Sequence, residues 1–276
     1  MQLSTALHQG TRLLEDGAVP SARLTAELLL CHALGRERSW LYAHSGEPLA
    51  ETAWIHYGRY LYQRLKGQPL QYITGHQEFY GRPFFVSPDV LIPRPETEHL
   101  IETALARAPE ARHAIDIGCG SGAIAVTWAL EKKQSVIATD ISTSALVVAQ
   151  ENARQLGARV DFLACNLGSA LPAGRFDLVM SNPPYIPDHE RESLQKEVRD
   201  HEPALALFCG PTGVEIYAPL IEDAARLLRP GGMVVLEIGY QAESAVRALL
   251  GAAWSAIEVA HDLAGWPRVL SAQRTD

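Results

Sequence analysis

Hydrophobic positions in the first 75 residues recur with the spacing of amphipathic α-helices. A first helix lies near the N-terminus, and a second begins after Ser21, a residue type that suits an N-cap, and ends before Gly35. A third runs from about Glu51 to Lys66 and stops at Gly67. The apolar residues expected on one face of the first helix are Leu3, Leu7, Leu13 and Leu14. Those expected to point inward on the second are Leu24, Leu28, Leu29 and Ala33, and the third helix carries Trp54, Tyr57, Leu61 and Leu65. Three such helices predict a small bundle, either a purely structural cap or a recognition module.

The pattern changes after Gly75. Residues 79–86 are typical of a short hairpin or bent ribbon, and the proline-rich stretch 91–98 leads into a further helix. Residues 76–95 are therefore expected to form a hairpin linker.

From residue 113 onward, strand and helix patterns alternate. The helices between the early strands are expected at 123–132 and 144–156, and another at 214–228 precedes the fifth strand. Alternation of this kind predicts an α/β fold with a doubly wound sheet, whose ligands bind outside the carboxyl ends of the strands. The last two strands are too close in sequence for a parallel crossover, so an antiparallel pair is expected at one edge. The seven candidate strands are 114–117, 136–140, 160–164, 176–181, 233–238, 257–260 and 268–272.

Composition narrows the class of protein. The chain is 47% hydrophobic with a formal net charge of −8, and residues 1–75 carry seven Lys and Arg against six Asp and Glu. No basic stripe marks a nucleic-acid surface, so no stable nucleic-acid complex is expected. No apolar run is long enough for a membrane span, and the first ten residues lack a secretory pattern. The four scattered cysteines show no metal-ligand spacing, so a metal-free cytoplasmic protein is expected.

A glycine-rich turn follows the first strand of the predicted sheet. Its segment, residues 116–123, reads Asp-Ile-Gly-Cys-Gly-Ser-Gly-Ala, and the second strand ends at Asp140, which is placed to bind ribose hydroxyls. The glycine spacing alone also fits a nicotinamide-dependent oxidoreductase. Asp116 favours a ligand with a cationic group, such as the amino group of a methionine moiety. Cys119 has the character of a small buried residue.

The fourth strand ends in Asn182-Pro183-Pro184-Tyr185. Each proline restricts the residue before it to an extended conformation, so the segment is expected to be stiff. The side-chain oxygen of Asn182 and the carbonyl of Pro183 could each accept one N–H bond from a planar NH2 group. Tyr185 could stack on that group or form the pocket wall. We refer to residues 182–185 as the NPPY segment.

The glycine turn, Asp140 and the NPPY segment together resemble S-adenosylmethionine-dependent methyltransferases that act on amide or exocyclic amino nitrogen. Over nearly its full length the chain is similar to the HemK family, the release-factor glutamine N5-methyltransferases. The specific part of this resemblance is the octapeptide 91–98 together with the NPPY segment. The other matching stretches are residues 69–75, 78–81, 201–203 and 236–239.

The resemblance implies S-adenosylmethionine as cofactor, class-I peptide-chain release factors as partners, and the glutamine of their Gly-Gly-Gln motif as substrate. It also implies an N-terminal helical, substrate-recognising domain at 1–75, the linker at 76–95, and a seven-stranded Rossmann-like class I methyltransferase domain at 96–276. The catalytic residues would be Asn182, Pro183 and Tyr185, and Pro184 would join them in binding substrate. The cofactor would contact Asp116, Gly118, Cys119, Gly120, Ser121, Gly122, Asp140, Asn166, Leu167 and Asn182.

Two stretches depart from the family pattern. Asn166 and Leu167 stand where an Asp followed by a large apolar residue is usual, and Cys209-Gly-Pro-Thr-Gly213 replaces Gly-Gly-x-Asp-Gly. The roles of Arg94 and Glu96 are open between positioning substrate and bracing the linker, whereas Glu202 and Glu237 are expected to be structural. Three alternatives remain: a methyltransferase acting on a flipped nucleic-acid base, the nicotinamide oxidoreductase, and a binding module without catalysis.

Overall fold

The computed structural model describes residues 1–275 and divides the chain into two compact units. The first unit comprises Met1–Gly75 together with Gln195–His201. The second comprises residues 76–194 and the described residues from 202 onward. Among residues 1–275, no helix combines the length and the apolar character that a bilayer crossing requires.

The first unit is helical and has its own core. The predicted helices are present as α1, α2 and α4, and they pack around buried side chains that include Leu30 and Tyr57. The prediction of side chains that face the core is wrong at two positions, because Leu13 is 46% exposed and Leu24 is 42% exposed. Ser21 precedes α2 in a left-handed conformation and makes no side-chain capping bond. The helices of this unit are α1 (Leu3–Asp16), α2 (Ala22–Leu34), α3 (Arg38–Ala43), α4 (Glu51–Leu65), α5 (Leu70–Thr74) and α9 (Lys196–His201).

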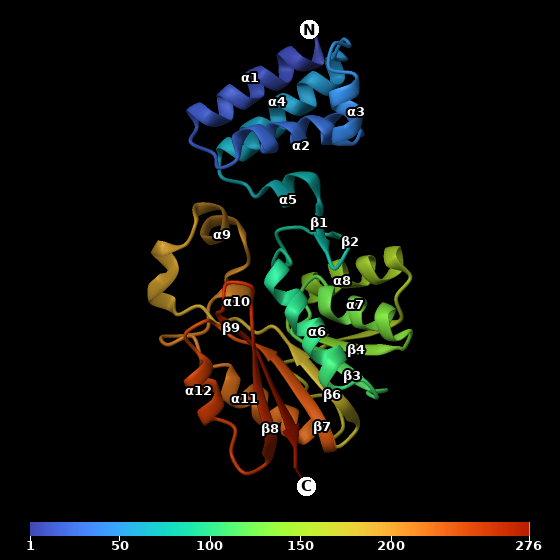
Figure 1. Cartoon of the computed structure of the whole chain (residues 1–276), viewed down its shortest axis with the longest axis vertical. Helices are drawn as coiled ribbons and strands as arrows, with labels where there is room; N and C mark the ends of the chain where they lie inside the picture. Colours follow the sequence, from blue (N-terminus) through green and yellow to red (C-terminus); the bar gives the residue numbers. More distant parts are fainter. Residues whose placement is uncertain (276) are drawn as a thin grey trace. The chain divides into compact units, whose positions relative to one another are not determined.

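The second unit is built on a seven-stranded sheet, seen in Figure 1. The strand order is β5-β4-β3-β6-β7-β9-β8, with the first five strands parallel and β9 antiparallel to both of its neighbours. This confirms the doubly wound sheet and its antiparallel edge. The order reverses between β3 and β6, where ligands of such folds bind. The strands are β3 (Ala114–Ile117), β4 (Val136–Asp140), β5 (Val160–Ala164), β6 (Phe176–Ser181), β7 (Leu228–Glu237), β8 (Trp254–His261) and β9 (Pro267–Arg274).

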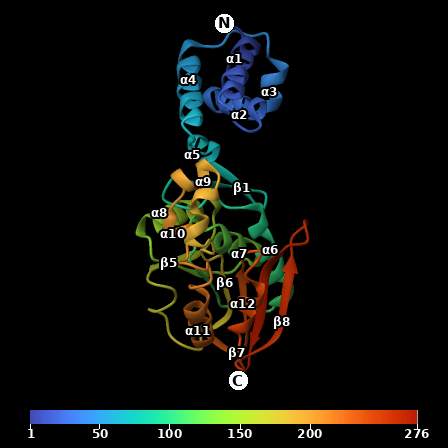
Figure 2. The same cartoon turned by 90° about the vertical axis from the view of Figure 1, so that its left-hand side faces the viewer.

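Helices cover both faces of the sheet (Figure 2). Neighbouring residues of one strand point to opposite sides, so Ala114 packs in the layer under α6, α7 and α8, whereas Ile115 packs in the layer under α11 and α12. Burial on both faces explains why the strands read as continuous apolar runs. The helices and short helical turns are η1 (Pro95–Thr97), α6 (Glu98–Arg107), α7 (Ala123–Lys132), α8 (Thr143–Leu156), η2 (Asp188–Ser193), α10 (Ala204–Leu207), α11 (Tyr217–Leu227) and α12 (Glu243–Ala248).

The predicted hairpin is present as β1 (His76–Phe79) and β2 (Arg82–Phe85), paired antiparallel. It belongs to the second unit, because Phe79 and Phe84 are fully buried in the core layer beneath α6 to α8. The Asn152 side chain in α8 also exchanges two hydrogen bonds with the backbone of Phe85. The hairpin is thus anchored to the sheet domain along its length.

The fifth strand of the sheet was expected to begin at residue 233. The structure instead begins β7 at Leu228, which pairs with Phe176, and the next partners along the two strands are Met233 and Leu178. The intervening residues form an irregularity within the strand. Helix α11 begins at Tyr217, three residues later than expected.

Candidate active site

A cavity of about 420 Å³ lies at the carboxyl ends of β3, β4 and β6. This volume is in the range of small-molecule sites. The segment Pro88–Arg94 and helix α10 also contribute to its lining. The structure brings these expected site residues together around the cavity: Gly118, Cys119, Gly120, Ser121, Asp140, Asn166, Leu167, Asn182, Pro183 and Pro184.

Three expected site residues lie outside the cavity lining. Asp116 is fully buried in β3, and Gly122 packs against Ala149 of α8. The Tyr185 hydroxyl donates to Glu237 Oε1 at 3.2 Å, and the residues that line the cavity do not include Tyr185. A direct ligand contact for these three residues remains a prediction.

The glycine turn gives the cavity an open floor. Gly118 and Gly120 have φ angles of 73° and 52°, and a Cβ at either position would meet no atom within 4 Å. The amides of Gly118 and Cys119 both donate to Thr139 O, which ties the turn to the neighbouring strand β4. The backbone can therefore be approached closely by a ligand, as the glycine pattern predicted.

Backbone amides hold the carboxylate of Asp140 at the end of β4. Its Oδ2 accepts from Gly120 N and its Oδ1 accepts from Ser142 N, each at 2.8 Å. The side chain is thus fixed between the glycine turn and the start of α8. Remaining lone pairs of the two oxygens can accept from ligand hydroxyls, because a carboxylate offers about four acceptor sites.

Asp116 has one oxygen without a partner. Its Oδ2 accepts from Ala125 N at 3.1 Å, but its buried Oδ1 accepts no hydrogen bond from residues 1–275. Burial raises the pKa of this carboxyl from an ordinary 3.8 to about 8. A cationic group bound near Oδ1 would favour the ionised form. The unpartnered oxygen beneath the glycine turn therefore fits a ligand that carries an amino group.

The raised pKa of Asp116 predicts how stability depends on pH. The fold holds a proton on this carboxyl that the unfolded chain has lost, from about pH 4 to about pH 8. Stability from this group is present below pH 4 and is lost as pH rises toward 8, by about 1.4 kcal/mol per pH unit. Urea unfolding at pH 6 and pH 8 should therefore show a smaller difference for Asp116→Asn than for the wild type. Equal differences would contradict a protonated Asp116.

Close packing supports the NPPY segment. A Cβ on Gly213 would lie 2.6 Å from Tyr185 O, and one on Gly239 would lie 3.3 Å from the Tyr185 ring. The backbone of Ile186 is bonded on both sides, donating to Leu207 O and accepting from Cys209 N, each at 3.0 Å. The stiffness predicted from the two prolines is thus reinforced by a neighbouring loop and the end of β7.

Side chains of the loop that departs from the family pattern bond its backbone. Glu215 Oε1 accepts from both the amide and the hydroxyl of Thr212 at 2.8 Å, and Cys209 Sγ accepts from Ile216 N at 3.0 Å. A carboxylate two residues beyond the turn thus bonds its backbone. The second stretch that departs from the family pattern is Asn166-Leu167. Both residues line the cavity, and Leu167 has a φ of 52°.

Two buried residues behind Asn182 were not predicted as site residues. Asn182 Nδ2 donates to Thr97 Oγ1 at 3.0 Å, and Thr97 Oγ1 donates to Glu237 Oε2 at 2.6 Å. Glu237, expected to be structural, is 1% exposed. Burial raises the pKa of Glu237 to about 7 although hydrogen bonds from Thr97 and Tyr185 oppose the rise. In the sequence, the sign that Glu237 could belong to the site is that it is a single acidic residue at the end of the apolar strand β7.

Arg94 and Glu202 form an ion pair beside the cavity. Arg94 Nη2 donates to Glu202 Oε1 at 2.5 Å, and Ile92 N donates to Glu202 Oε2 at 3.2 Å. Glu202 is 6% exposed, so this carboxylate ties the proline-rich segment to the start of α10. The geometry favours the bracing role for Arg94, although Arg94 also lines the cavity.

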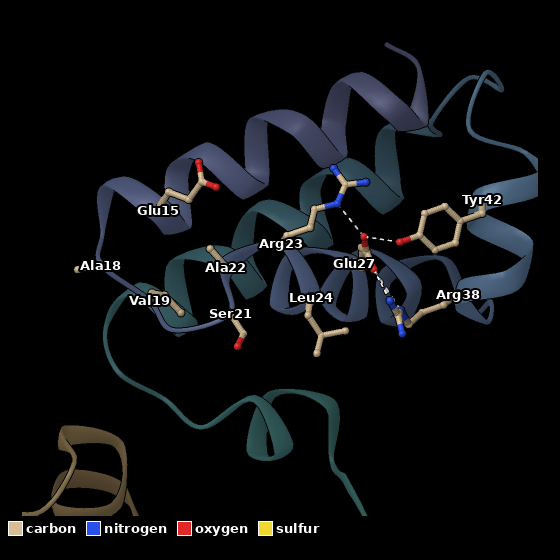
Figure 3. Close-up of a pocket in the computed structure, with 10 residues that line it drawn as sticks. All are labelled: Glu15, Ala18, Val19, Ser21, Ala22, Arg23, Leu24, Glu27, Arg38 and Tyr42. Atoms are coloured by element: carbon tan, nitrogen blue, oxygen red, sulfur yellow. Dashed lines mark hydrogen bonds and ion pairs between the residues drawn. The ribbon is translucent and has the colours of Figure 1, made fainter.

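A second, open hollow of about 750 Å³ lies in the first unit (Figure 3). Arg23, Arg38 and Tyr42 converge there on Glu27, with distances of 2.7, 2.7 and 2.6 Å to its carboxylate oxygens. Burial alone would raise the pKa of Glu27, but the hydrogen bonds from these three residues lower it. The cluster satisfies its own charges and joins α2 to α3, so its geometry supports a structural role.

Comparison with known proteins defines the class and then the family. Residues 95–201 match the family described as "Methyltransferase small domain" and residues 5–75 match "PrmC N-terminal domain". A T. thermophilus 16S rRNA N2 G1207 methyltransferase, solved with AdoMet and guanosine, shares the fold with a TM-score of 0.52 at 20% identity, covering 72% of this chain and 49% of that chain. The second unit thus has the Rossmann-like fold of such methyltransferases, and its cavity contains part of the segment that matches the methyltransferase family.

Two full-length relatives make the assignment specific. The release factor glutamine methyltransferase of Koribacter versatilis is 44% identical over 98% of both chains. That of Moorella thermoacetica is 44% identical over the full length of both chains. The chain belongs to the release factor glutamine methyltransferase family. Family membership selects the methyltransferase over the oxidoreductase that the glycine spacing left open.

Proposed function

We propose that this protein methylates the side-chain amide nitrogen of the glutamine in the Gly-Gly-Gln motif of class-I peptide-chain release factors, with S-adenosylmethionine as methyl donor. The observation that carries the proposal is 44% identity over essentially the whole chain to relatives named for this activity. The site adds a stiff NPPY segment beside a glycine-floored cavity. Cytoplasmic location and the absence of a stable nucleic-acid complex belong to the same proposal, as does substrate recognition by the first unit.

The cavity offers suitable groups for the cofactor. The turn from Gly118 to Ser121 would hold its amino acid portion above the unpartnered oxygen of Asp116. Asp140 would accept from the ribose hydroxyls, and Asn166 and Leu167 would contact the adenine. When bound, S-adenosylmethionine supplies a methyl group on a positively charged sulfur.

The chain's own contribution is to orient a weak nucleophile. The lone pair of an amide nitrogen is delocalised into its carbonyl, so the nitrogen must be held in one orientation. Asn182 Oδ1 and the carbonyl of Pro183 would each accept one of its two N–H bonds and stabilise the positive charge that develops there. Orientation can contribute roughly 7–11 kcal/mol, against about 3 kcal/mol for one well-directed polar contact. The proton leaves after transfer, so no side chain must act as a base beforehand.

A labelled methyl donor tests the proposal directly. The protein would be incubated with labelled S-adenosylmethionine and a purified class-I release factor, and the Gly-Gly-Gln peptide analysed by mass spectrometry. One added methyl group on the glutamine is expected, and none on a release factor whose motif glutamine is replaced by alanine. Parallel reactions with DNA and tRNA address the base methyltransferase alternative. Label in nucleic acid but not in release factor would overturn the proposal.

A further inference from the structure

Three segments distant in sequence meet behind the Asn182 side chain. Thr97 lies in η1 before α6, Asn182 follows β6, and Glu237 ends β7. We propose that Thr97 and Glu237 are positioning residues that set the orientation of the Asn182 amide, so that its oxygen faces the substrate nitrogen. This inference rests on the proposed function and adds two residues to its machinery.

The single proton of the Thr97 hydroxyl determines the direction of the hydrogen bonds. Thr97 donates that proton to Glu237 Oε2 at 2.6 Å, so only its lone pairs remain for Asn182. The amide must then present its NH2 to Thr97, at 3.0 Å. Its Oδ1, which accepts no hydrogen bond from residues 1–275, is left for the cavity that Asn182 lines.

The opposite orientation would disable the site. With the amide reversed, Nδ2 would face a substrate NH2 group, and two donors would oppose each other. The substrate nitrogen would lose one of its two acceptors and with it the fixed direction of its lone pair. Because Thr97 and Glu237 are 4% and 1% exposed, water does not readily substitute for either partner.

The protonation state of the Glu237 carboxyl decides whether the Asn182 amide keeps this orientation. When ionised, both of its oxygens accept, one from Thr97 and one from the Tyr185 hydroxyl. When protonated, it can donate to Thr97, whose own proton can then turn toward Asn182 Oδ1 and allow the reversed amide. Burial favours the protonated form, and the charge of Arg268 on β9 opposes it. Glu96 in η1 also acts on this carboxyl, as does Tyr217 in α11, whose hydroxyl donates to the backbone carbonyl of Glu237.

Substitutions at Thr97 separate positioning from packing. Thr97→Val keeps the volume and removes the hydroxyl, so kcat should fall roughly 10- to 100-fold. KM for release factor and the cofactor Kd should change little. Thr97→Ser keeps the hydroxyl and should restore most of the wild-type kcat. If the valine and serine variants have the same kcat, or if Thr97→Val matches the wild type, the proposal is wrong.

The pH profile tests Glu237. Wild-type kcat should rise between pH 6 and pH 8 as Glu237 ionises, because its pKa lies at about 7. Glu237→Gln keeps an acceptor for Thr97 but cannot ionise, so its profile should be flat over this range. An unchanged rise in Glu237→Gln would overturn the role of its charge. An inactive wild type at every pH would instead contradict the proposed function, so the two failures are distinguishable.

Discussion

Asn182→Ala is expected to lower kcat for release factor methylation by about 100- to 1,000-fold. The substitution removes the amide oxygen that would accept from the substrate nitrogen, and it leaves Thr97 Oγ1 without its donor. Both the stabilisation of developing charge and the orientation of the nucleophile are lost together. Single-turnover methylation at saturating cofactor would measure the effect on the chemical step.

Measuring the cofactor Kd shows whether Asn182→Ala slows the chemical step or disrupts the whole site. Asn182 lies at the end of β6, whereas Asn166 follows β5 and lines another part of the same cavity. Asn166→Ala should therefore raise the cofactor Kd more than it lowers kcat at saturation, and Asn182→Ala should do the reverse. Near-normal turnover in Asn182→Ala would refute the catalytic role of its amide.

The sequence predicts the sheet domain well for a physical reason. Strands buried on both faces must be apolar throughout, so runs such as Met233–Leu236 stand out from the helices around them. Helix ends and exposed positions are set by weaker preferences. Ser21 occupies an N-cap position without making the capping bond, and the apolar Leu13 and Leu24 are exposed.

The site was only partly predictable. The glycine turn and the NPPY segment depend on backbone conformation, which short sequence patterns encode directly. The contacts of Thr97 and Glu237 with each other and with the NPPY segment join residues 52 to 140 positions apart, and no local pattern predicts such pairs. The bonding of the divergent loop by Glu215 is likewise visible only in the structure, where the amides of Thr212 and Val214 donate to its carboxylate.

The glycines of the turn have different roles, which the sequence pattern does not distinguish. Gly122 has a φ of 80°, and a Cβ there would lie 3.1 Å from Ala149 Cβ and 3.3 Å from Ala149 Cα. Gly120 has a φ of 52°, and a Cβ there would meet open space over the cavity floor. Gly122 thus permits close packing of the turn against α8, and Gly120 permits close approach of a ligand.

Gly122→Ala should therefore destabilise the fold, by roughly 2–4 kcal/mol from left-handed strain and overpacking combined. The melting temperature should fall by about 5–15 °C. Gly120→Ala carries the strain alone, about 1–2 kcal/mol, but its methyl group enters the cavity. Its cofactor Kd should rise about 10- to 100-fold, equivalent to roughly 1.4–2.8 kcal/mol.

Differential scanning calorimetry and titration calorimetry on both variants separate the two effects. Gly122→Ala, measured well below its melting temperature, should still bind S-adenosylmethionine better than Gly120→Ala, although it is the less stable protein. This inverse order of stability and affinity follows only if one glycine faces α8 and the other faces the ligand. Equal melting temperatures, or weaker binding by Gly122→Ala than by Gly120→Ala, would contradict that division of roles.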